Sequence, residues 1–260
     1  MKKLEFTKMV ATGNDFVVIS GSRPRLARLA RSICDRRFGI GADGLLVLDR
    51  SRKADARMRI FNADGSEAEM CGNGARCAAY YLNKKELTLD TKAGVLTAFV
   101  NGNNVKLQLS CSGKIRAGIK LDICGRKVMV DFINTGVPHA VIFVQGLEDM
   151  DIDRLGRMVR YHKVFAPSGA NADFVEVVNA NTIKVRTYER GVEAETLACG
   201  TGSTASALVF AFKSSAAGPV KVITRSKEIL TISFKNVSDR FKDIWLEGRA
   251  KIVYKGVYHV

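Results

Sequence analysis

The chain has 260 residues, 47% of them hydrophobic, and 41 basic against 26 acidic side chains give it a formal net charge of +15. This length allows one large core or two of ordinary size. No apolar run is long enough to span a membrane, and Glu5 and Lys8 interrupt the apolar stretch that a signal peptide needs. The six cysteines are too sparse for a disulfide framework, and none makes a paired zinc-ligand spacing with a histidine. We therefore expect a cytoplasmic protein with reduced thiols, no membrane contact and no metal.

The positive charge is most concentrated in a segment whose arginines alternate with apolar residues at helical spacing. They are Arg23, Arg25, Arg28, Arg31, Arg36 and Arg37. A basic stripe of this kind could contact nucleic acid or a membrane surface. However, no aromatic residues are interleaved for base stacking. We expect a solvated helix face and no nucleic-acid partner.

The predicted elements of the first half alternate between strands and helices. Strands are expected at Leu4–Lys8 and Phe16–Ile19, a helix at about 24–36, strands at Leu45–Leu48 and 56–61, a helix after Cys71, and strands near 87–91, 95–100 and 104–110. Loops separate them, and three of these loops carry Asn14, the glycine-rich stretch Phe38–Gly44, and Asn62.

The second half repeats this order. A strand at about 127–133 leads through a loop to a strand at Ala140–Val144, a helix follows at about 151–161, and a second Cys-Gly-x-Gly begins at Cys199. Gly41 precedes Cys71 by 30 positions, and Gly169 precedes Cys199 by the same interval. We infer an α/β (α+β) fold of two pseudo-symmetric domains, each a mixed sheet wrapped around one apolar helix.

The domain boundary is expected near Ser112–Gly113, where strand-like sequence gives way to small and polar residues. The first domain then comprises residues 1–113 with 248–260 and carries Cys71. The second comprises 114–247 and carries Cys199.

The two Cys-Gly-x-Gly stretches each place a thiol at the start of a helix. The first amides of a helix lack intrahelical partners and the helix dipole adds partial positive charge, so a helix start binds carboxylates and stabilises a thiolate. Both effects lower a thiol's pKa from about 8.5. A single such cysteine is more often a small buried residue, but two copies in matched surroundings favour function.

Two thiols, one on each side of a small molecule, suit the inversion of a carbon centre. One thiolate removes a proton, the other thiol returns one from the opposite side, and both helix starts stabilise the charge that develops on the substrate carboxylate. The sequence contains no recognisable pyridoxal phosphate context, nucleotide loop or metal-ligand cluster. We therefore expect cofactor-independent chemistry on a small-molecule amino-acid substrate.

Over essentially its whole length the sequence resembles the diaminopimelate epimerase family. The motifs that carry the resemblance are Lys8-Met9 with Gly13–Phe16, Arg37–Gly44, Asn62–Ser66, Met70–Cys77, Tyr188–Gly191 and Ala198–Gly202. The resemblance implies interconversion of LL- and meso-2,6-diaminoheptanedioate, a step towards lysine and towards cell-wall precursors. It also implies a homodimer.

The family's residue roles carry over as follows. Cys71 and Cys199 would alternate as base and acid, and His139 and Glu189 would tune the pKa values of the thiols. The substrate would be held by Asn14, Asn62, Gly72, Asn73, Asn171, Glu189, Arg190, Gly200 and Thr201. Arg190 suits the distal carboxylate because its planar fork binds bidentately.

The chain departs from the family pattern at two positions, and two other readings stay open. Val137 stands where many relatives have asparagine before Pro-His, and Gly44 stands where some have glutamine. One alternative is a racemase of another amino acid on the same fold. The other is a two-lobed binding protein, which would need neither thiol.

Overall fold

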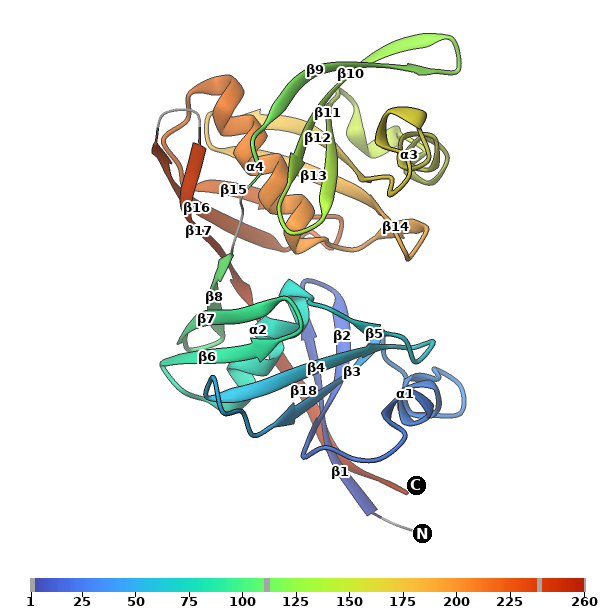
Figure 1. The fold of residues 1–260 in the computed structure, drawn as a ribbon, viewed down its shortest axis with the longest axis vertical. Helices are drawn as coiled ribbons and strands as arrows, with labels where there is room; N and C mark the ends of the chain where they lie inside the picture. Colours follow the sequence, from blue (N-terminus) through green and yellow to red (C-terminus); the bar gives the residue numbers. More distant parts are fainter. Residues whose placement is uncertain (1–2, 110–112, 238–239, 260) are drawn as a thin grey trace. The chain divides into compact units, whose positions relative to one another are not determined.

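The computed structural model describes residues 3–109, 113–237 and 240–259 and divides into two compact units. Unit 1 comprises Met1–Gln108 with Glu247–Val260, and unit 2 comprises Leu109–Leu246. Each unit contains a curved sheet, a buried helix and a peripheral helix (Figure 1).

Unit 1 is a mixed sheet whose strands surround one helix. The strands are β1 (Lys3–Ala11), β2 (Asn14–Ser20), β3 (Gly44–Asp49), β4 (Ala56–Asn62), β5 (Glu67–Ala68), β6 (Glu86–Thr91), β7 (Gly94–Asn101), β8 (Asn104–Leu109) and β18 (Lys251–His259). Pairing is antiparallel except between β2 and β3 and between β4 and β6, which run parallel. The central helix α2 (Gly72–Leu82) contacts strands on both sides of it, including β1, β2 and β7.

The composition of α2 explains why it is central. Its residues from Gly72 to Ala79 are all buried, and most are glycine, alanine or cysteine. Small side chains allow strands to approach the helix closely on every side. A Cβ on Gly74 would lie 3.1 Å from the Leu46 side chain of β3, so this glycine is needed for the close approach. The peripheral helix α1 (Leu26–Cys34) buries only its apolar face.

Unit 2 repeats the topology of unit 1. Its strands are β9 (Arg116–Ile123), β10 (Arg126–Asn134), β11 (Pro138–Phe143), β12 (Asn171–Asn179), β13 (Thr182–Glu189), β14 (Ala194–Thr196), β15 (Val220–Ile223), β16 (Ile229–Val237) and β17 (Arg240–Arg249). The pairs β11–β12 and β13–β15 are parallel, as are their counterparts in unit 1. The peripheral helix is α3 (Ile152–Arg160), and the central helix α4 (Gly200–Ser214) is buried from its first turn.

The predicted fold class is therefore confirmed, and so are most of the predicted elements. The sequence pattern did not predict β9, a strand with only two buried residues. Helix α1 is shorter than predicted because the Asp35 carboxylate accepts hydrogen bonds from the backbone N–H groups of Arg37 and Phe38 in a turn that ends it.

The C-terminal segment returns to unit 1, where β18 pairs antiparallel with β1. Of the expected boundary residues Ser112 and Gly113, Ser112 lies outside the described residues. The division into domains of residues 1–113 with 248–260 and 114–247 stays a prediction. No helix in the described part of the chain combines the length and hydrophobicity that crossing a bilayer requires.

Candidate active site

In unit 1, Cys71 is the residue immediately before helix α2. Its backbone is extended (φ −145°, ψ 121°), and its side chain is partly exposed. The thiol donates to Asn14 Oδ1, with 3.8 Å between Sγ and Oδ1. Asn73, in the first turn of α2, donates from Nδ2 to the same oxygen at 3.4 Å. The structure therefore brings together three predicted site residues, Asn14, Cys71 and Asn73.

A cluster of charged side chains holds the loop that carries Asn14. Asp15 pairs with Lys8 at 2.7 Å and with Arg36 at 2.8 Å, and Asn14 Nδ2 donates to Asp43 Oδ2 at 2.6 Å. Burial raises the pKa of Asp15, but the hydrogen bonds from Arg36 and Lys8 outweigh it and lower that pKa to about 2. Asp15 is therefore ionised at neutral pH, and its contacts fix the start of β2.

Asn62 lies at the end of β4, on the same side of the sheet as Asn14. Gly44 of β3 pairs with Asn62 of β4 on one side and with Phe16 of β2 on the other, so Asn62 and Asn14 lie at the same end of two strands that flank β3. The Asn62 carboxamide is held in its own turn, donating from Nδ2 to Ser66 Oγ at 2.9 Å.

In unit 2, three neighbouring strands place three predicted residues side by side. His139 of β11 pairs with Asn171 of β12, and Glu189 lies at the end of β13, one residue beyond the Ala172–Tyr188 pair. Asn171 Nδ2 lies 3.4 Å from His139 Nε2, and Asn171 Oδ1 accepts from the backbone N–H of Arg190 at 2.7 Å. Asn171 therefore ties the histidine strand to the loop that begins at Arg190.

The Cys199 thiol differs from that of Cys71 in its surroundings. Cys199 is buried, and its Sγ accepts from the backbone N–H of Gly202 at 3.4 Å and lies 3.4 Å from Thr201 Oγ1. Burial raises the pKa of this thiol well above its ordinary value, and the carboxylates of Glu189 and Asp173 raise it further. The helix start and Thr201 act in the opposite direction but do not compensate.

Glu189 has the properties of a proton-accepting group beside that thiol. Burial raises the pKa of its carboxyl group, while hydrogen bonds from Thr196 and Cys199 oppose the rise. Thr196 Oγ1 donates to Glu189 Oε1 at 2.5 Å. A thiol and a carboxyl group, both with raised pKa values and in contact, titrate as a pair and can pass a proton between them.

Asp173 was not predicted as a site residue, although it holds His139. Both side chains are fully buried, and Asp173 Oδ2 lies 2.7 Å from His139 Nδ1. Thr187 Oγ1 donates to the other carboxylate oxygen at 2.8 Å. A carboxylate on Nδ1 fixes the imidazole orientation and directs Nε2 towards Asn171. Sequence reasoning gave no role to an aspartate two positions after Asn171.

The remaining predicted residues of unit 2 lie at the helix start and the adjoining loop. Gly200 and Thr201 form the first turn of α4, and Thr201 O accepts from Thr135 Oγ1 at 3.1 Å. Within the described part of the chain, the guanidinium of Arg190 makes one long hydrogen bond, from Nη1 to Ser168 O at 3.3 Å. The side chain is thus positioned while most of its donors stay available to a ligand. Gly72, the matching first residue of α2, is buried.

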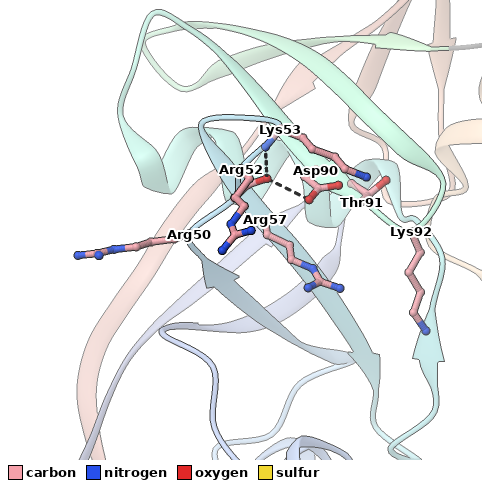
Figure 2. A pocket seen from close by; sticks show the side chains of 8 residues that line it. Arg50, Arg52, Lys53, Arg57, Asp90, Thr91 and Lys92 are labelled. Atoms are coloured by element: carbon pink, nitrogen blue, oxygen red, sulfur yellow. Dashed lines mark hydrogen bonds between the residues drawn. The ribbon is translucent and has the colours of Figure 1, made fainter.

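A surface pocket of about 490 Å³ in unit 1 contains none of the predicted residues. Its lining is basic and includes Arg50, Arg57 and Lys92. These side chains point in different directions (Figure 2), and Lys92 forms an ion pair with Glu67 at 2.9 Å. The pocket therefore offers no convergent anion site.

The two departures from the family pattern have different structural settings. A Cβ at Gly44 would lie 2.9 Å from Phe61 O, so a larger residue here requires the backbone to shift. Val137 is partly buried in the turn before β11 and supplies no polar group beside His139. Among the described residues, no cluster of three or more His, Cys, Asp or Glu side chains has a metal-binding arrangement.

Comparison with known proteins agrees with this geometry. The sequence model of the family described as Diaminopimelate epimerase matches residues 6–115 and 132–253. A diaminopimelate epimerase of Aquifex aeolicus (strain VF5) is 42% identical over 274 aligned positions, which cover 97% of each chain. One from Archaeoglobus fulgidus is 44% identical and covers 80% of this chain and 81% of its own.

Solved structures with low sequence identity share the fold. A phenazine biosynthesis protein of the PhzF family from Bacillus anthracis superposes with a TM-score of 0.79 at 18% identity over the whole of both chains. A probable proline racemase from Agrobacterium radiobacter K84 superposes with a TM-score of 0.73 at 17% identity, covering 99% of this chain and 92% of its own. These two likenesses bear on the fold alone. The family match and the curated relatives show that the chain belongs to the diaminopimelate epimerase family.

Proposed function

We propose that this protein is an isomerase that interconverts LL- and meso-2,6-diaminoheptanedioate, with Cys71 and Cys199 as the two proton carriers. The proposal is supported by the relatives' names and by one structural observation. Each unit presents a cysteine at the start of its buried central helix, in the same place in the topology. Inversion needs one acid–base group on each side of the reacting carbon, and two equivalent thiols meet that need.

The reaction begins with one thiol ionised and the other protonated. The thiolate takes the α-proton, and the electron pair left on carbon is delocalised into the adjacent carboxylate. The opposite thiol then donates its proton to the other face, so the two cysteines end with their protonation states exchanged. The N–H groups in the first turns of α2 and α4, including those of Gly72, Asn73, Gly200 and Thr201, would stabilise the extra negative charge on the carboxylate.

The other predicted residues would hold the substrate or tune the Cys199 thiol. Arg190 is assigned to the distal carboxylate because a guanidinium with several available donors binds a carboxylate bidentately. Asn14, Asn62 and Asn171 are assigned to the polar groups of the amino acid. His139 and Glu189 both lie in unit 2, where they would accept and return the proton of Cys199.

We also propose a cytoplasmic homodimer that serves lysine and cell-wall precursor synthesis. The resemblance to the family supports this assembly, and so do exposed apolar side chains on β18, which are Val253, Tyr254 and Val257. A second copy covering this strand would remove that apolar surface from water. Light scattering on the purified protein measures its mass directly.

The test is to incubate purified protein with LL-diaminoheptanedioate and follow the meso isomer by chiral chromatography. Wild type should produce it, whereas Cys71→Ala and Cys199→Ala should not, and both variants should remain folded because each loses only one small side chain. A panel of single-centre amino acids tests the alternative of a different racemase. Turnover of that panel in preference to diaminoheptanedioate would select the alternative, and near-normal turnover by either cysteine variant would exclude the two-thiol mechanism.

A further inference from the structure

A fully buried arginine lies directly beneath the Cys71 helix start. Arg76 has no exposed surface, although it belongs to a helix otherwise built from small and apolar residues. Its Nη2 donates to Thr12 Oγ1 at 2.6 Å and to Asn73 Oδ1, and its Nε lies 3.4 Å from Gly72 O. Burying a guanidinium is costly unless it is well bonded. The contacts show where these bonds go: to Asn73 and to the turn before Asn14.

The guanidinium determines which way the Asn73 carboxamide faces. An arginine side chain has only donors, so the atom that Asn73 turns towards Arg76 must be its oxygen. The Asn73 nitrogen is then directed to the other side, where Nδ2 donates to Asn14 Oδ1 at 3.4 Å.

The far end of the same chain of bonds is fixed by a negative charge. The Asp43 carboxyl group pairs with Arg36 through Oδ1 at 2.7 Å, and its Oδ2 accepts from Asn14 Nδ2 at 2.6 Å, so Asn14 turns its nitrogen towards Asp43. The oxygen of Asn14 therefore faces Asn73 and the thiol of Cys71. A cation at one end and an anion at the other leave each carboxamide a single favourable orientation.

We propose that Arg76 and Asp43 are positioning residues that set the orientations of the Asn73 and Asn14 carboxamides beside Cys71. This inference rests on the proposed function only in that Cys71 is taken to carry the proton. Its consequence is that an acceptor oxygen is held against the protonated thiol and a donor nitrogen of Asn73 is held at the helix start. Neither residue is expected to touch the substrate.

The other central helix indicates that this arrangement is not needed for folding. Thr204 lies five positions after Cys199, as Arg76 does after Cys71. Among the residues that the structure describes, its hydroxyl bonds within its own helix, from Oγ1 to Gly200 O at 2.9 Å. Helix α4 is thus buried and regular with a small residue at this position, so an arginine in α2 calls for a role beyond helix packing.

Substitutions at Arg76 separate an orienting role from a packing role because the two predict opposite orders. Lysine keeps a buried cation that can only donate, whereas methionine fills the space without charge. For orientation, Arg76→Lys should retain more turnover than Arg76→Met, and Arg76→Met should lose about tenfold or more in kcat. For a packing role, Arg76→Met should have the higher free energy of unfolding and Arg76→Lys the lower, since an apolar side chain is easier to bury than a charged one. Arg76→Met being at least as active as Arg76→Lys would overturn the proposal.

A second readout does not depend on the reaction. Alkylation of Cys71 by iodoacetamide is followed against pH by peptide mass spectrometry, with Cys199 in the same molecule as internal control. Arg76→Met should shift the Cys71 profile along the pH axis, because it removes a nearby buried cation and releases the acceptor oxygen that Asn14 holds against the thiol, and should leave the Cys199 profile in place. Arg186→Met is the matched control, since it removes a buried arginine bonded to Glu195 in unit 2. Equal Cys71 profiles in wild type, Arg76→Met and Arg186→Met would overturn the proposal.

A double-variant cycle tests whether the two ends act through one chain of bonds. Asp43→Asn keeps the shape but can present either a donor or an acceptor to Asn14, so it should lower kcat severalfold alone and add little to Arg76→Met. If the double variant loses kcat by the full product of the two separate losses, Arg76 and Asp43 act independently, and the proposal is wrong. Inactive wild type with a shifted Cys71 profile would instead reject the proposed reaction while retaining this inference.

Discussion

Replacement of Gly202 by alanine should disturb the His139–Asp173 pair from the helix side. Gly202 lies in the first turn of α4, so a methyl group here meets no backbone strain. It would, however, overlap Asp173 Oδ1 and lie 3.2 Å from Thr187 Oγ1. Asp173 cannot move aside easily, because it is fully buried with one oxygen bonded to Thr187 and the other to His139.

The cost has two parts. Forcing one extra carbon into a packed site typically costs about 1–3 kcal/mol. Displacing the carboxylate also weakens a hydrogen bond to a charged group, typically about 1.5–3 kcal/mol. Together they predict a loss of about 2.5–6 kcal/mol in the free energy of unfolding, or a fall of roughly 5–24 °C in Tm for a chain of this size. His139 would also lose its orientation, so kcat should drop by about tenfold or more.

Calorimetry and the epimerisation assay measure the two effects, and Ser203→Ala is the matched control. Ser203 is the next residue of the same turn and is equally buried, but its truncation adds no volume. A Gly202→Ala variant with the Tm and turnover of the control would refute the reasoning. It would mean that the carboxylate relaxes freely and that the His139–Asp173 contact does not position the histidine.

Three further predictions concern the charged residues Arg190, Glu189 and Asp15. Arg190→Ala should lower kcat/KM on diaminoheptanedioate by about thirtyfold or more, since a lost buried charge-assisted contact costs about 2–5 kcal/mol. The same substitution should leave kcat/KM on substrates without a distal carboxylate nearly unchanged. Equal losses on the two kinds of substrate would reject the assignment of Arg190 to the distal carboxylate. Glu189→Gln should raise the free energy of unfolding at pH 7 and lower turnover. Burial raises the Glu189 pKa, so ionisation of this carboxyl group destabilises the folded state as the pH rises through that pKa. Denaturant titration at two pH values measures the change in the free energy of unfolding. The Asp15 pKa is lowered from 3.8 to about 2, so the stabilisation that ionised Asp15 gives to the folded state is complete above pH 3.8 and lost as the pH falls through about 2. Asp15→Asn should therefore reduce the fall in the free energy of unfolding over this pH range. An unchanged fall would contradict the stabilising role of the Asp15 ion pairs.

The two helix starts were predictable because their signal is local. Cys-Gly-x-Gly followed by small apolar residues specifies both a helix and its burial, and its second occurrence at Cys199 indicated the repeat. The parallel pairs β2–β3 and β11–β12 then place the loop residues of each half beside its helix.

The residues that orient the site were not predictable in the same way. Arg76 bonds to Thr12, 64 positions earlier, and His139 pairs with Asp173, 34 positions later. Such contacts arise from tertiary packing between elements far apart in the chain and leave no mark in a window of sequence. One signal was nevertheless available for Arg76: a charged residue in the middle of a run of small residues otherwise expected to be buried must have strong partners.

The central claim is that two different groups remove and return the proton, and isotope labelling during the first turnovers tests it most directly. LL-diaminoheptanedioate is incubated with enzyme in heavy water, and both isomers are recovered at low conversion for mass spectrometry. Because one thiol takes the proton and the other supplies a solvent-derived deuteron, the account predicts one deuterium at the inverted α-carbon of the meso product and almost none in the remaining LL substrate. Meso product without deuterium, or LL substrate labelled as fast as product forms, would indicate a single base and contradict the two-thiol mechanism.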